Sequence, residues 1–240
     1  MQASTAELPL HQRRRQPTAA ELDGIPWLKH LRPPEYERAI GHITVGDAHP
    51  GDFVCRVGRP VTYWFGLVEG LLKMSADGPL GQTVTFTGVP PGGWFGEGTA
   101  LKREAYRYNI QPLRRSVVAG LPVDTFHWLL DHSIGFNRFV MNQLNERLAQ
   151  FIAAREIDRL TNPDVRVARS LASLFNPVLY PGVGEVLRIT QQELAYLVGL
   201  SRQRVNEALS ALEAQGAIQV EYGGLRILDL QALRTSGQKP

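Results

Sequence analysis

Four polar residues near the start of one amphipathic segment are of the types that read DNA bases: Arg202, Gln203, Arg204 and Asn206. Arginine forms paired hydrogen bonds with guanine in the major groove, and asparagine or glutamine does the same with adenine. Apolar residues of this segment recur three or four positions apart, as on one face of a helix. They are Val205, Ala208, Leu209 and Leu212. The pattern predicts a helix that buries one side and presents base-reading groups on the other.

A second, shorter helix is predicted directly before this one. Thr190 followed by Glu193 is a capping box, in which each side chain satisfies a backbone N–H of the first helical turn. Gly199 stands where the chain must turn, and Ser201 is a natural N-cap for the next helix. Two helices joined by a tight corner form a helix-turn-helix, whose second helix offers its first residues to the bases. The predicted DNA-binding residues are Thr190, Gln191, Ser201, Arg202, Gln203, Arg204, Asn206 and Glu207.

The segment after these helices has the pattern of a β-hairpin. Residues 217–222 alternate between apolar and polar, Gly223 and Gly224 can form a two-residue turn, and residues 225–227 alternate again. A hairpin that follows the second helix is a wing, so the whole is predicted to be a winged helix-turn-helix. The alternative is an ordinary helical hairpin with a solvated polar face, and the wing favours DNA binding over it.

Residues 43–126 contain many short apolar runs separated by glycine and proline, such as 53–57 and 63–68. Regularly spaced short strands indicate a small β-barrel or jelly-roll. After it, Ser133 is expected to cap a long helix that ends near Thr161. The apolar stripe of this helix is Phe136, Val140, Leu144, Leu148 and Phe151. Such a helix can pack on the barrel and against a second copy of the chain.

The predicted organisation is therefore α+β. A flexible tail covers residues 1–25, a β-roll 26–132, a dimerisation helix 133–161, the winged helix-turn-helix 162–232, and a second tail 233–240. Asn162 and Pro163 mark the boundary, as N-cap and first residue of a new helix. The run Arg13–Arg15 is interpreted as part of a solvated arm, with a phosphate-contacting arm as the alternative.

Composition limits the classes of protein. The chain has 240 residues and a formal net charge of +3, and the eight Lys and Arg residues from Pro163 onward face seven Asp and Glu. DNA affinity must therefore depend on local placement of arginine, helix N-termini and dimerisation. No apolar run is long enough for a membrane span, and no secretory signal is visible. The single cysteine, Cys55, cannot form a disulfide within the chain, which fits a protein of the reducing cytoplasm.

Three parts in this order resemble the CRP/FNR family of bacterial transcription regulators. The segment ITQQELAYLVGLSRQRVNEALSALEAQGAI is similar to the family's recognition segment, and GDFVCRVG and GGWFGEG resemble the glycine signatures of its cyclic-nucleotide-binding β-roll. The resemblance covers about residues 26–232. It implies a homodimer that binds an inverted-repeat operator in double-stranded DNA. Dimers of this family often contact RNA polymerase.

The resemblance also implies an effector pocket. Gly96 and Glu97 match the family's Gly-Glu, whose carboxylate receives a ribose hydroxyl, and Arg107 matches the arginine that pairs with the cyclic phosphate. The sequence departs from nucleotide binders at Tyr108, where they have Ser or Thr, and at the adenine-binding pair, which becomes Phe151 and Ile152. These departures predict that cyclic AMP is not the effector, and they favour an apolar or aromatic acid as effector, or no effector. A cyclic-nucleotide-responsive regulator and a β-roll module that does not bind DNA remain the alternatives.

Other sensor chemistries and enzymes are not favoured by the residues. An iron–sulfur member would need several cysteines, and this chain has one. The histidines lack the paired spacing of axial haem ligands, and Cys55 is interpreted as a small buried hydrophobe and not as a redox switch. No His-x-His metal motif and no nucleophile elbow occurs. The sequence therefore predicts no catalytic residue, no metal site and no cofactor.

Overall fold

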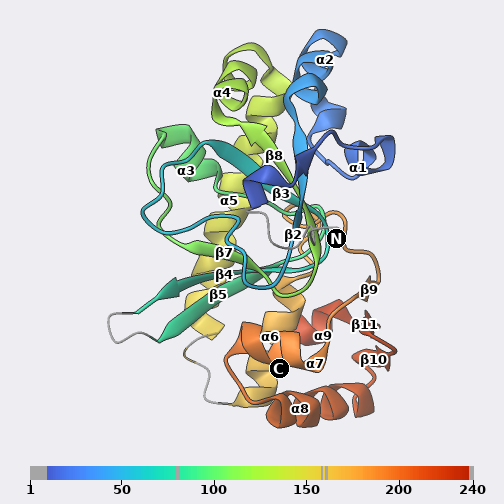
Figure 1. Ribbon diagram of the computed structural model, residues 1–240. Helices are drawn as coiled ribbons and strands as arrows, with labels where there is room; N and C mark the ends of the chain where they lie inside the picture. The colour runs from blue at the N-terminus through green and yellow to red at the C-terminus, as the bar shows by residue number, and fades with distance from the viewer. Residues whose placement is uncertain (1–9, 79–81, 158, 160–161, 238–240) are drawn as a thin grey trace, which may run out of the picture.

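A computed structural model describes residues 10–78, 82–157, 159 and 162–237. The chain forms two parts joined by the long helix α5 (Ile134–Ile157), with the β-roll above and the helix-turn-helix below in Figure 1. The predicted α+β architecture of β-roll, long helix and winged helix-turn-helix is confirmed. None of the described helices combines the length and apolar character needed to cross a membrane.

Two antiparallel sheets form the β-roll. The first has the order β1 (Arg14–Arg15), β2 (Thr44–Ala48), β8 (Ser116–Pro122), β3 (Tyr63–Glu69) and β6 (Trp94–Phe95). The second has the order β5 (Thr83–Val89), β4 (Leu72–Asp77) and β7 (Asn109–Pro112). Between them lies a core that contains Phe65, Leu72 and Val118. Gly66 of β3 has no room for a side chain, because an added Cβ would lie 2.3 Å from the Trp94 ring.

Short helices surround the roll, and several gather at its top in Figure 1. They are the 3-10 turns η2 (Leu10–Gln12) and η3 (Leu28–His30) and the α-helices α1 (Ala19–Asp23), α2 (Pro33–His42), α3 (Glu97–Lys102) and α4 (Val123–His132). The beginning of α5 is joined to the roll by an aromatic cluster. Trp27 meets Phe136 edge to face with ring centroids 5.3 Å apart, and Trp64 lies 4.4 Å from Trp94. The roll and the first half of α5 therefore share one hydrophobic core.

The lower part is the predicted winged helix-turn-helix, and we call it the DNA-binding domain after that prediction. Its elements are α6 (Pro163–Ser173), β9 (Val186–Leu187), α7 (Gln191–Val198), α8 (Arg202–Ala214), β10 (Ile218–Glu221), β11 (Gly224–Ile227) and α9 (Leu230–Thr235). The Asn162 side chain caps α6 and Pro163 begins the helix, as the sequence predicts. Apolar faces of the helices meet around Leu171, Leu194 and Leu209, each at most 1% exposed.

The prediction of a flexible N-terminal tail is wrong for residues 10–25, while residues 1–9 lie outside the described residues. The Arg13 guanidinium donates to the Asp52 carboxylate at 2.6 Å and contacts the His49 ring at 2.6 Å. Strand β1 pairs with β2, and the Arg14 guanidinium lies 3.9 Å from the centroid of the Tyr63 ring. These partners are distant in sequence, so the residues around the arginine run show its charge but not the contacts that fix it.

The C-terminal tail predicted from residue 233 also differs from the structure. Leu233 of α9 is fully buried in the core of the DNA-binding domain. Gly237 lies so close to Val165 that an added Cβ would be 2.7 Å from its side chain. Residues 233–237 are therefore part of the folded domain, and residues 238–240 lie outside the described residues.

The strand expected over residues 53–57 does not form. Cys55 makes only an isolated bridge with Ile110, and the Val57 N–H donates to the Asn109 side chain at 3.0 Å. A side-chain acceptor has replaced the partner strand at this point, which apolar alternation alone cannot reveal. The loop still belongs to the roll core, because Cys55 is 2% exposed.

The apolar stripe predicted on α5 divides between two directions. Phe136 and Val140 are buried in the roll of the same chain, and Leu144 is half-buried against it. Apart from Ile134 at its first position, the large apolar side chains that α5 leaves exposed are Met141, Leu148 and Ile152, at 57%, 62% and 65% exposure. We call these three residues the α5 seam. A helix that packs on more than one side shows no single apolar face, so the spacing alone does not tell which of its apolar residues face the roll.

Candidate DNA-binding surface and effector pocket

The helix-turn-helix is held by the caps that the sequence predicts. The Thr190 hydroxyl accepts from the Glu193 N–H at 3.1 Å, and the Glu193 carboxylate accepts from the Thr190 N–H at 2.7 Å. Gly199 ends α7 with φ at +65°, in the left-handed region that glycine tolerates. The Ser201 hydroxyl then caps α8 by accepting from the Arg204 N–H at 3.2 Å. The corner between the helices is therefore set by local hydrogen bonds.

The predicted base-reading side chains lie together on the outer face of α8. Arg202, Gln203, Asn206 and Glu207 are exposed, while Val205 on the opposite face is fully buried. The Asn206 amide oxygen accepts from the Gln191 side chain at 2.7 Å, so the first residue of α7 joins this surface. In the described part of the chain, Arg202 has no hydrogen-bond or ion-pair partner. Its guanidinium is available to a base or a phosphate.

Arg204 lies differently from its neighbours. Its guanidinium forms ion pairs with Asp164 of α6 at 2.6 Å and with Glu207 at 3.1 Å, and its side chain is 31% exposed. Asp164 is two residues after the cap of α6, so this pair connects the recognition helix to the entrance of the domain. Since phosphate would compete with two carboxylates, Arg204 is a weaker candidate for a DNA contact than Arg202.

The wing is an antiparallel hairpin of β10 and β11, and β11 also pairs with β9. Glu221 pairs with Gly224, so the two-residue turn is Tyr222–Gly223 and not the expected Gly223–Gly224. Gly223 has φ at +71°, and the Tyr222 side chain at the tip is fully exposed. Arg226 of the wing is paired with Glu221 at 2.6 Å and Glu185 at 2.9 Å.

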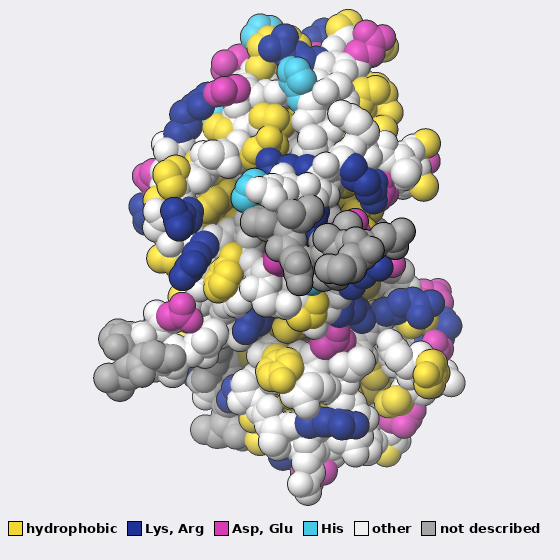
Figure 2. Space-filling view, in the orientation of Figure 1, with side chains coloured by type: hydrophobic (Ala, Val, Ile, Leu, Met, Phe, Trp, Pro, Cys, Tyr) yellow, Lys and Arg dark blue, Asp and Glu magenta, His cyan; other side chains and the backbone are white. Residues whose placement is uncertain are grey.

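Charge on the visible face of the molecule is mixed. Figure 2 shows Lys and Arg side chains spread over both domains, with Asp and Glu among them in the lower domain. This distribution agrees with the nearly balanced count of charges in the DNA-binding half. Affinity for a polyanion must therefore come from a few placed arginines and helix N-termini and not from a large basic field.

The predicted effector residues, with one exception, line a cavity of about 270 Å³ between α3, the roll and α5. Gly96 and Glu97, Arg107 and Tyr108, and Phe151 all contribute to its wall. Ile152 does not, because it lies in the exposed α5 seam. The Gly96–Glu97 turn depends on φ at +84° at Gly96, which places the Glu97 carboxyl at the start of α3.

Arg107 and Tyr108 do not form a clear anion clamp. The Arg107 guanidinium is paired with Glu104 at 2.9 Å, and its side chain is 76% exposed. Tyr108 points into the pocket, where its hydroxyl lies 3.6 Å from the position that a Cβ on Gly96 would take. Burial, together with the nearby Glu97 carboxylate, raises the pKa of Tyr108 well above its ordinary value. The neutral phenol fills space where the resemblance would place a small hydroxyl.

The residue that contacts Glu97 most directly was not predicted from the sequence. Arg147 of α5 is 8% exposed, and its Nε lies 3.5 Å from Oε1 of Glu97. Its other nitrogens donate to the Trp94 carbonyl at 2.7 Å and to the Tyr180 hydroxyl at 3.0 Å. Burial acts against the charge on Arg147, but the nearby Tyr180 and Glu97 raise its pKa, so the guanidinium stays protonated. Oε2 of Glu97 is buried and has no hydrogen-bond partner among the described residues.

A signal for Arg147 was present in the sequence. The residue lies three positions after Leu144 and four before Phe151, so it falls on the face of the helix that the stripe assigns to the interior. A charged residue at an interior position normally has a buried partner. The partner could not be identified, because Tyr180 and Trp94 are 33 and 53 residues away.

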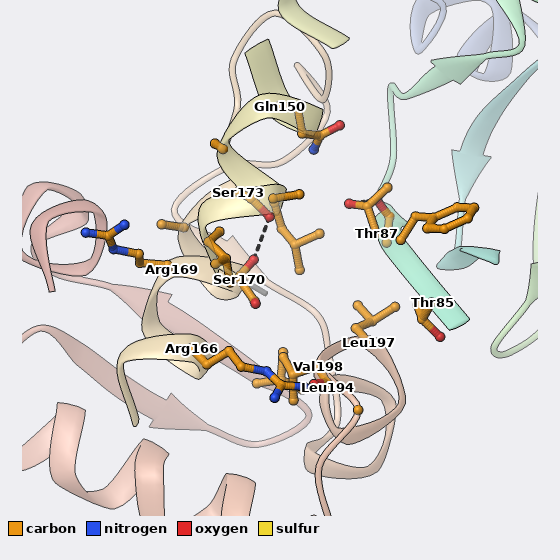
Figure 3. Close-up of a pocket in the computed structure, with 18 of the residues that line it drawn as sticks. Thr85, Thr87, Gln150, Arg166, Arg169, Ser170, Ser173, Leu194, Leu197 and Val198 are labelled. Atoms are coloured by element: carbon orange, nitrogen blue, oxygen red, sulfur yellow. Dashed lines mark hydrogen bonds between the residues drawn. The ribbon is translucent and has the colours of Figure 1, made fainter. Parts of the chain in front are cut away.

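A second and larger cavity, about 920 Å³, separates strand β5 from the helices of the DNA-binding domain. Figure 3 shows Thr85 and Thr87 of β5 on one side and Ser170 and Ser173 of α6 on the other. Leu197 of α7 also lines the cavity, and it lies so close to Gly88 that a Cβ added to Gly88 would be 2.7 Å from its side chain. The end of β5 is thus in direct contact with the first helix of the helix-turn-helix.

Comparison with known families agrees with both halves of this description. Residues 47–133 match the cyclic nucleotide-binding domain, and residues 165–236 match the Crp-like helix-turn-helix domain. The chain is 30% identical over 174 residues to the transcriptional regulator SdrP of Thermus thermophilus, covering 71% of this chain and 81% of that protein. It is 26% identical over 219 residues to a CRP-like cAMP-activated global transcriptional regulator of Mycobacterium tuberculosis, covering 85% and 88%.

Solved structures give the same result. TTHA1359 of Thermus thermophilus, a CRP/FNR family transcriptional regulator, superimposes with a TM-score of 0.53 at 26% identity over 79% of this chain and 96% of that one. FixK2 of Bradyrhizobium japonicum shares the fold with a TM-score of 0.64 at 16% identity, covering 80% and 96%. With a β-roll, a long helix and a winged helix-turn-helix in this order, the chain belongs to the CRP/FNR family of transcription regulators.

Proposed function

We propose that this regulator binds an inverted-repeat operator as a homodimer, and that cyclic AMP is not its effector. The observation that carries the DNA-binding part is the outer face of α8, where exposed Arg202, Gln203 and Asn206 stand beside Gln191 of α7. Side chains of these types form bidentate hydrogen bonds with guanine and adenine in the major groove.

The α5 seam supports the homodimer. Met141 and Leu148 are seven residues apart and Ile152 follows at four, which places all three on one side of the helix. Large apolar side chains at this exposure on a long helix indicate a surface that a second copy of α5 covers. Two-fold symmetry then brings two copies of α8 to half-sites about one helical turn of DNA apart.

The effector pocket supports a ligand that is not a cyclic nucleotide. Its volume of about 270 Å³ lies below the range of about 300–1,000 Å³ that is usual for ligand sites. Arg107, the expected phosphate partner, is already paired with Glu104. Phe151 meets Phe86 of β5 edge to face at 6.5 Å, so an aromatic pair stands where an adenine would need polar groups. These features favour a small apolar or aromatic acid, or no ligand at all.

The rival function is a regulator that responds to cyclic AMP, as the names of the Mycobacterium tuberculosis relative and of the global regulator CRP of Haemophilus influenzae say of those proteins. Each buried adenine hydrogen bond that is lost costs about 1–3 kcal/mol. The loss of two such hydrogen bonds lowers the affinity for cyclic AMP about a hundredfold or more.

Contact with RNA polymerase and a cytoplasmic location are also part of the proposal, because they are usual for the family.

Two measurements on the purified protein test the proposal. Selection from a pool of random DNA should return an inverted repeat, and a single unrepeated site would contradict the homodimer on DNA. Calorimetry with cyclic AMP should show no binding in the low micromolar range. Micromolar binding that also tightens operator binding would establish the rival function. A Phe151→Ser variant is the matched control, because it places a hydroxyl group in the pocket wall and leaves the α5 seam unchanged.

A further inference from the structure

The loop of residues 176–180, between α6 and β9, joins the DNA-binding domain to the other half of the molecule. We call it the latch loop. Its Leu179 and Tyr180 are 0% and 1% exposed, and they are buried in the core of the β-roll and not in that of their own domain. The Tyr180 ring also lies against Gly93, where an added Cβ would be 2.8 Å from it. A segment of the DNA-binding domain is therefore inserted into the effector domain.

One face of α5 is devoted to holding this loop. The Gln143 amide donates to the Val178 carbonyl at 2.7 Å, and the Asn176 amide donates to the Glu146 carboxylate at 3.1 Å. The Tyr180 hydroxyl accepts from Arg147 at 3.0 Å. The four helical residues that contact the loop are Gln143, Glu146, Arg147 and Gln150. Their spacing of three, one and three places them on a single side of the helix.

That side lies opposite the α5 seam. An α-helix turns about 100° per residue, so Met141, Leu148 and Ile152 point in one direction and the four latch-binding residues point roughly the other way. The helix thus offers one face to a second copy and the opposite face to the DNA-binding domain of its own chain. A fixed latch would therefore fix the position of α8 relative to the dimer axis.

Arg147 contacts the effector pocket, the roll and the latch loop at the same time. It contacts the effector-pocket carboxylate of Glu97 at 3.5 Å, the Trp94 carbonyl of the roll at 2.7 Å, and the Tyr180 hydroxyl of the latch loop at 3.0 Å. Oε2 of Glu97 is left without a partner among the described residues, so the carboxylate is not saturated. A group that enters the pocket meets Glu97 and Arg147 together, because both line its wall.

We propose that Arg147 and Tyr180 are positioning residues for DNA binding: their hydrogen bond fixes the DNA-binding domain against α5, directly beside the effector pocket. The inference rests on the proposed function in two readouts, operator affinity and the distance between the protomers of a dimer, while hydrogen exchange is independent of it. The position of the two α8 helices must match half-sites about 34–36 Å apart, so a looser latch weakens binding without touching the base-reading residues.

The test compares two variants that each remove one buried tyrosine hydroxyl. Tyr180→Phe removes the latch bond and keeps the ring in the core. Tyr106→Phe is the matched control, because its hydroxyl donates to the Tyr63 carbonyl at 2.9 Å, entirely within the roll. Tyr106 belongs to the same core cluster as Tyr180, so a general loosening of that core would affect both variants.

Three readouts are measured on the full chain. The Val178 and Leu179 amides donate to the Asn176 side chain at 2.9 Å. The rate of hydrogen exchange at these two amides should increase about tenfold in Tyr180→Phe. A spin label at Ser210→Cys, exposed on α8, should report a broader distance distribution between the two protomers. Operator affinity should fall about tenfold. Tyr106→Phe should leave all three unchanged.

The outcomes separate the latch from the proposed function. If the wild-type chain binds no operator or forms no dimer, the proposed function fails, and hydrogen exchange still decides on the latch. Tyr180→Phe with wild-type exchange and affinity would overturn the inference. Faster exchange without a change in affinity would overturn the positioning role, and equal losses in both variants would identify a general loss of packing instead.

Discussion

Arg202 is the residue on which base recognition can be tested most directly. It is exposed at the first position of α8 and has no partner among the described residues, whereas Arg204 is held by Asp164. Replacing Arg202 by alanine should cost about 1–3 kcal/mol of discrimination at one base pair, because one bidentate contact is lost. Binding selection with random DNA measures this. Arg59→Ala, an exposed arginine on the roll, is the control.

Arg202 could instead contact a phosphate of the DNA backbone, and the same selection experiment distinguishes the two roles. If the Arg202→Ala variant binds more weakly but selects the same sequence, the guanidinium contacts a phosphate and carries no sequence information. Gln203 and Asn206 would then be the remaining candidates for base readout on α8.

A second prediction at the residue scale concerns acid and the N-terminal segment. Hydrogen bonds from Arg15 hold the pKa of Glu21 at about 2, against an ordinary value of 4.5. A carboxyl whose pKa is lowered by folding stabilises the folded state fully above its unfolded pKa. This contribution should be lost as the pH falls from about 4.5 toward 2.

Glu21→Gln isolates this effect from the protonation of other carboxyls. The difference in the free energy of unfolding between the variant and the parent chain should be present at pH 7 and should vanish near pH 2. Denaturant titrations at several pH values measure it. A difference that stayed constant over this range would show that the Arg15–Glu21 pair does not respond to acid in this way.

At the scale of the element, α5 is a helix with two faces packed against its own chain and a third face exposed. One side packs on the roll through Phe136 and Val140, a second holds the latch loop, and the α5 seam is left exposed. Gly135 lets the start of the helix approach the His30 carbonyl, where an added Cβ would be 2.1 Å away. A helix fixed this firmly to its own roll can present a rigid surface to a second copy.

Leu148→Asp should convert the protein to a monomer with weak operator binding. The substitution would place an unpaired charge in an apolar interface, at a cost of several kcal/mol. Analytical ultracentrifugation measures the state. Val57→Asp is the matched control, because Val57 is also an exposed apolar residue but lies on the roll. A Leu148→Asp variant that still sedimented as a dimer would place the interface elsewhere.

The elements differ in how far the sequence could predict them. Local signals were enough for the helix-turn-helix, because Thr190, Glu193, Gly199 and Ser201 act within three or four residues of their partners. The ends of the chain could not be read this way, since Arg13 and Leu233 are held by partners far away in sequence. The cavity proposed as the effector pocket lies beside Gly96 and Glu97, two residues that the glycine signature singles out.

The content of that pocket depends on tertiary contacts that no short motif encodes. Arg147 comes from a helix 50 residues after Glu97, and its further partner Tyr180 comes from the DNA-binding domain. The sequence could indicate that an interior position on α5 was charged. It could not indicate that the charge would lie beside the pocket and contact a loop from the other domain.

At the scale of the whole molecule, DNA binding should depend steeply on salt. The exposed Arg202, the N-terminus of α7 at Thr190 and the wing are available to phosphates, and a dimer doubles each contact. With about 6–10 phosphate contacts, affinity should fall about 10³–10⁵-fold between 50 and 200 mM salt. Fluorescence anisotropy with a labelled operator measures the slope.

The pairing of Arg204 and Arg226 with carboxylates bears on this slope. Both guanidinium groups must exchange or share their acidic partners when they contact phosphate. A slope close to zero would contradict phosphate anchoring and would favour a protein partner for this surface. Asp164→Asn, which frees Arg204 from one carboxylate, should make the slope steeper by at most one contact per protomer.

Each half of the molecule contributes buried residues to the hydrophobic core of the other half. Leu179 and Tyr180 complete the core of the roll, while Leu71, just before β4, is buried in the core of the DNA-binding domain. Neither half can open without exposing apolar surface of the other. Heating should therefore melt the protein in one cooperative transition, with equal calorimetric and van't Hoff enthalpies, although its family is assembled from two domains.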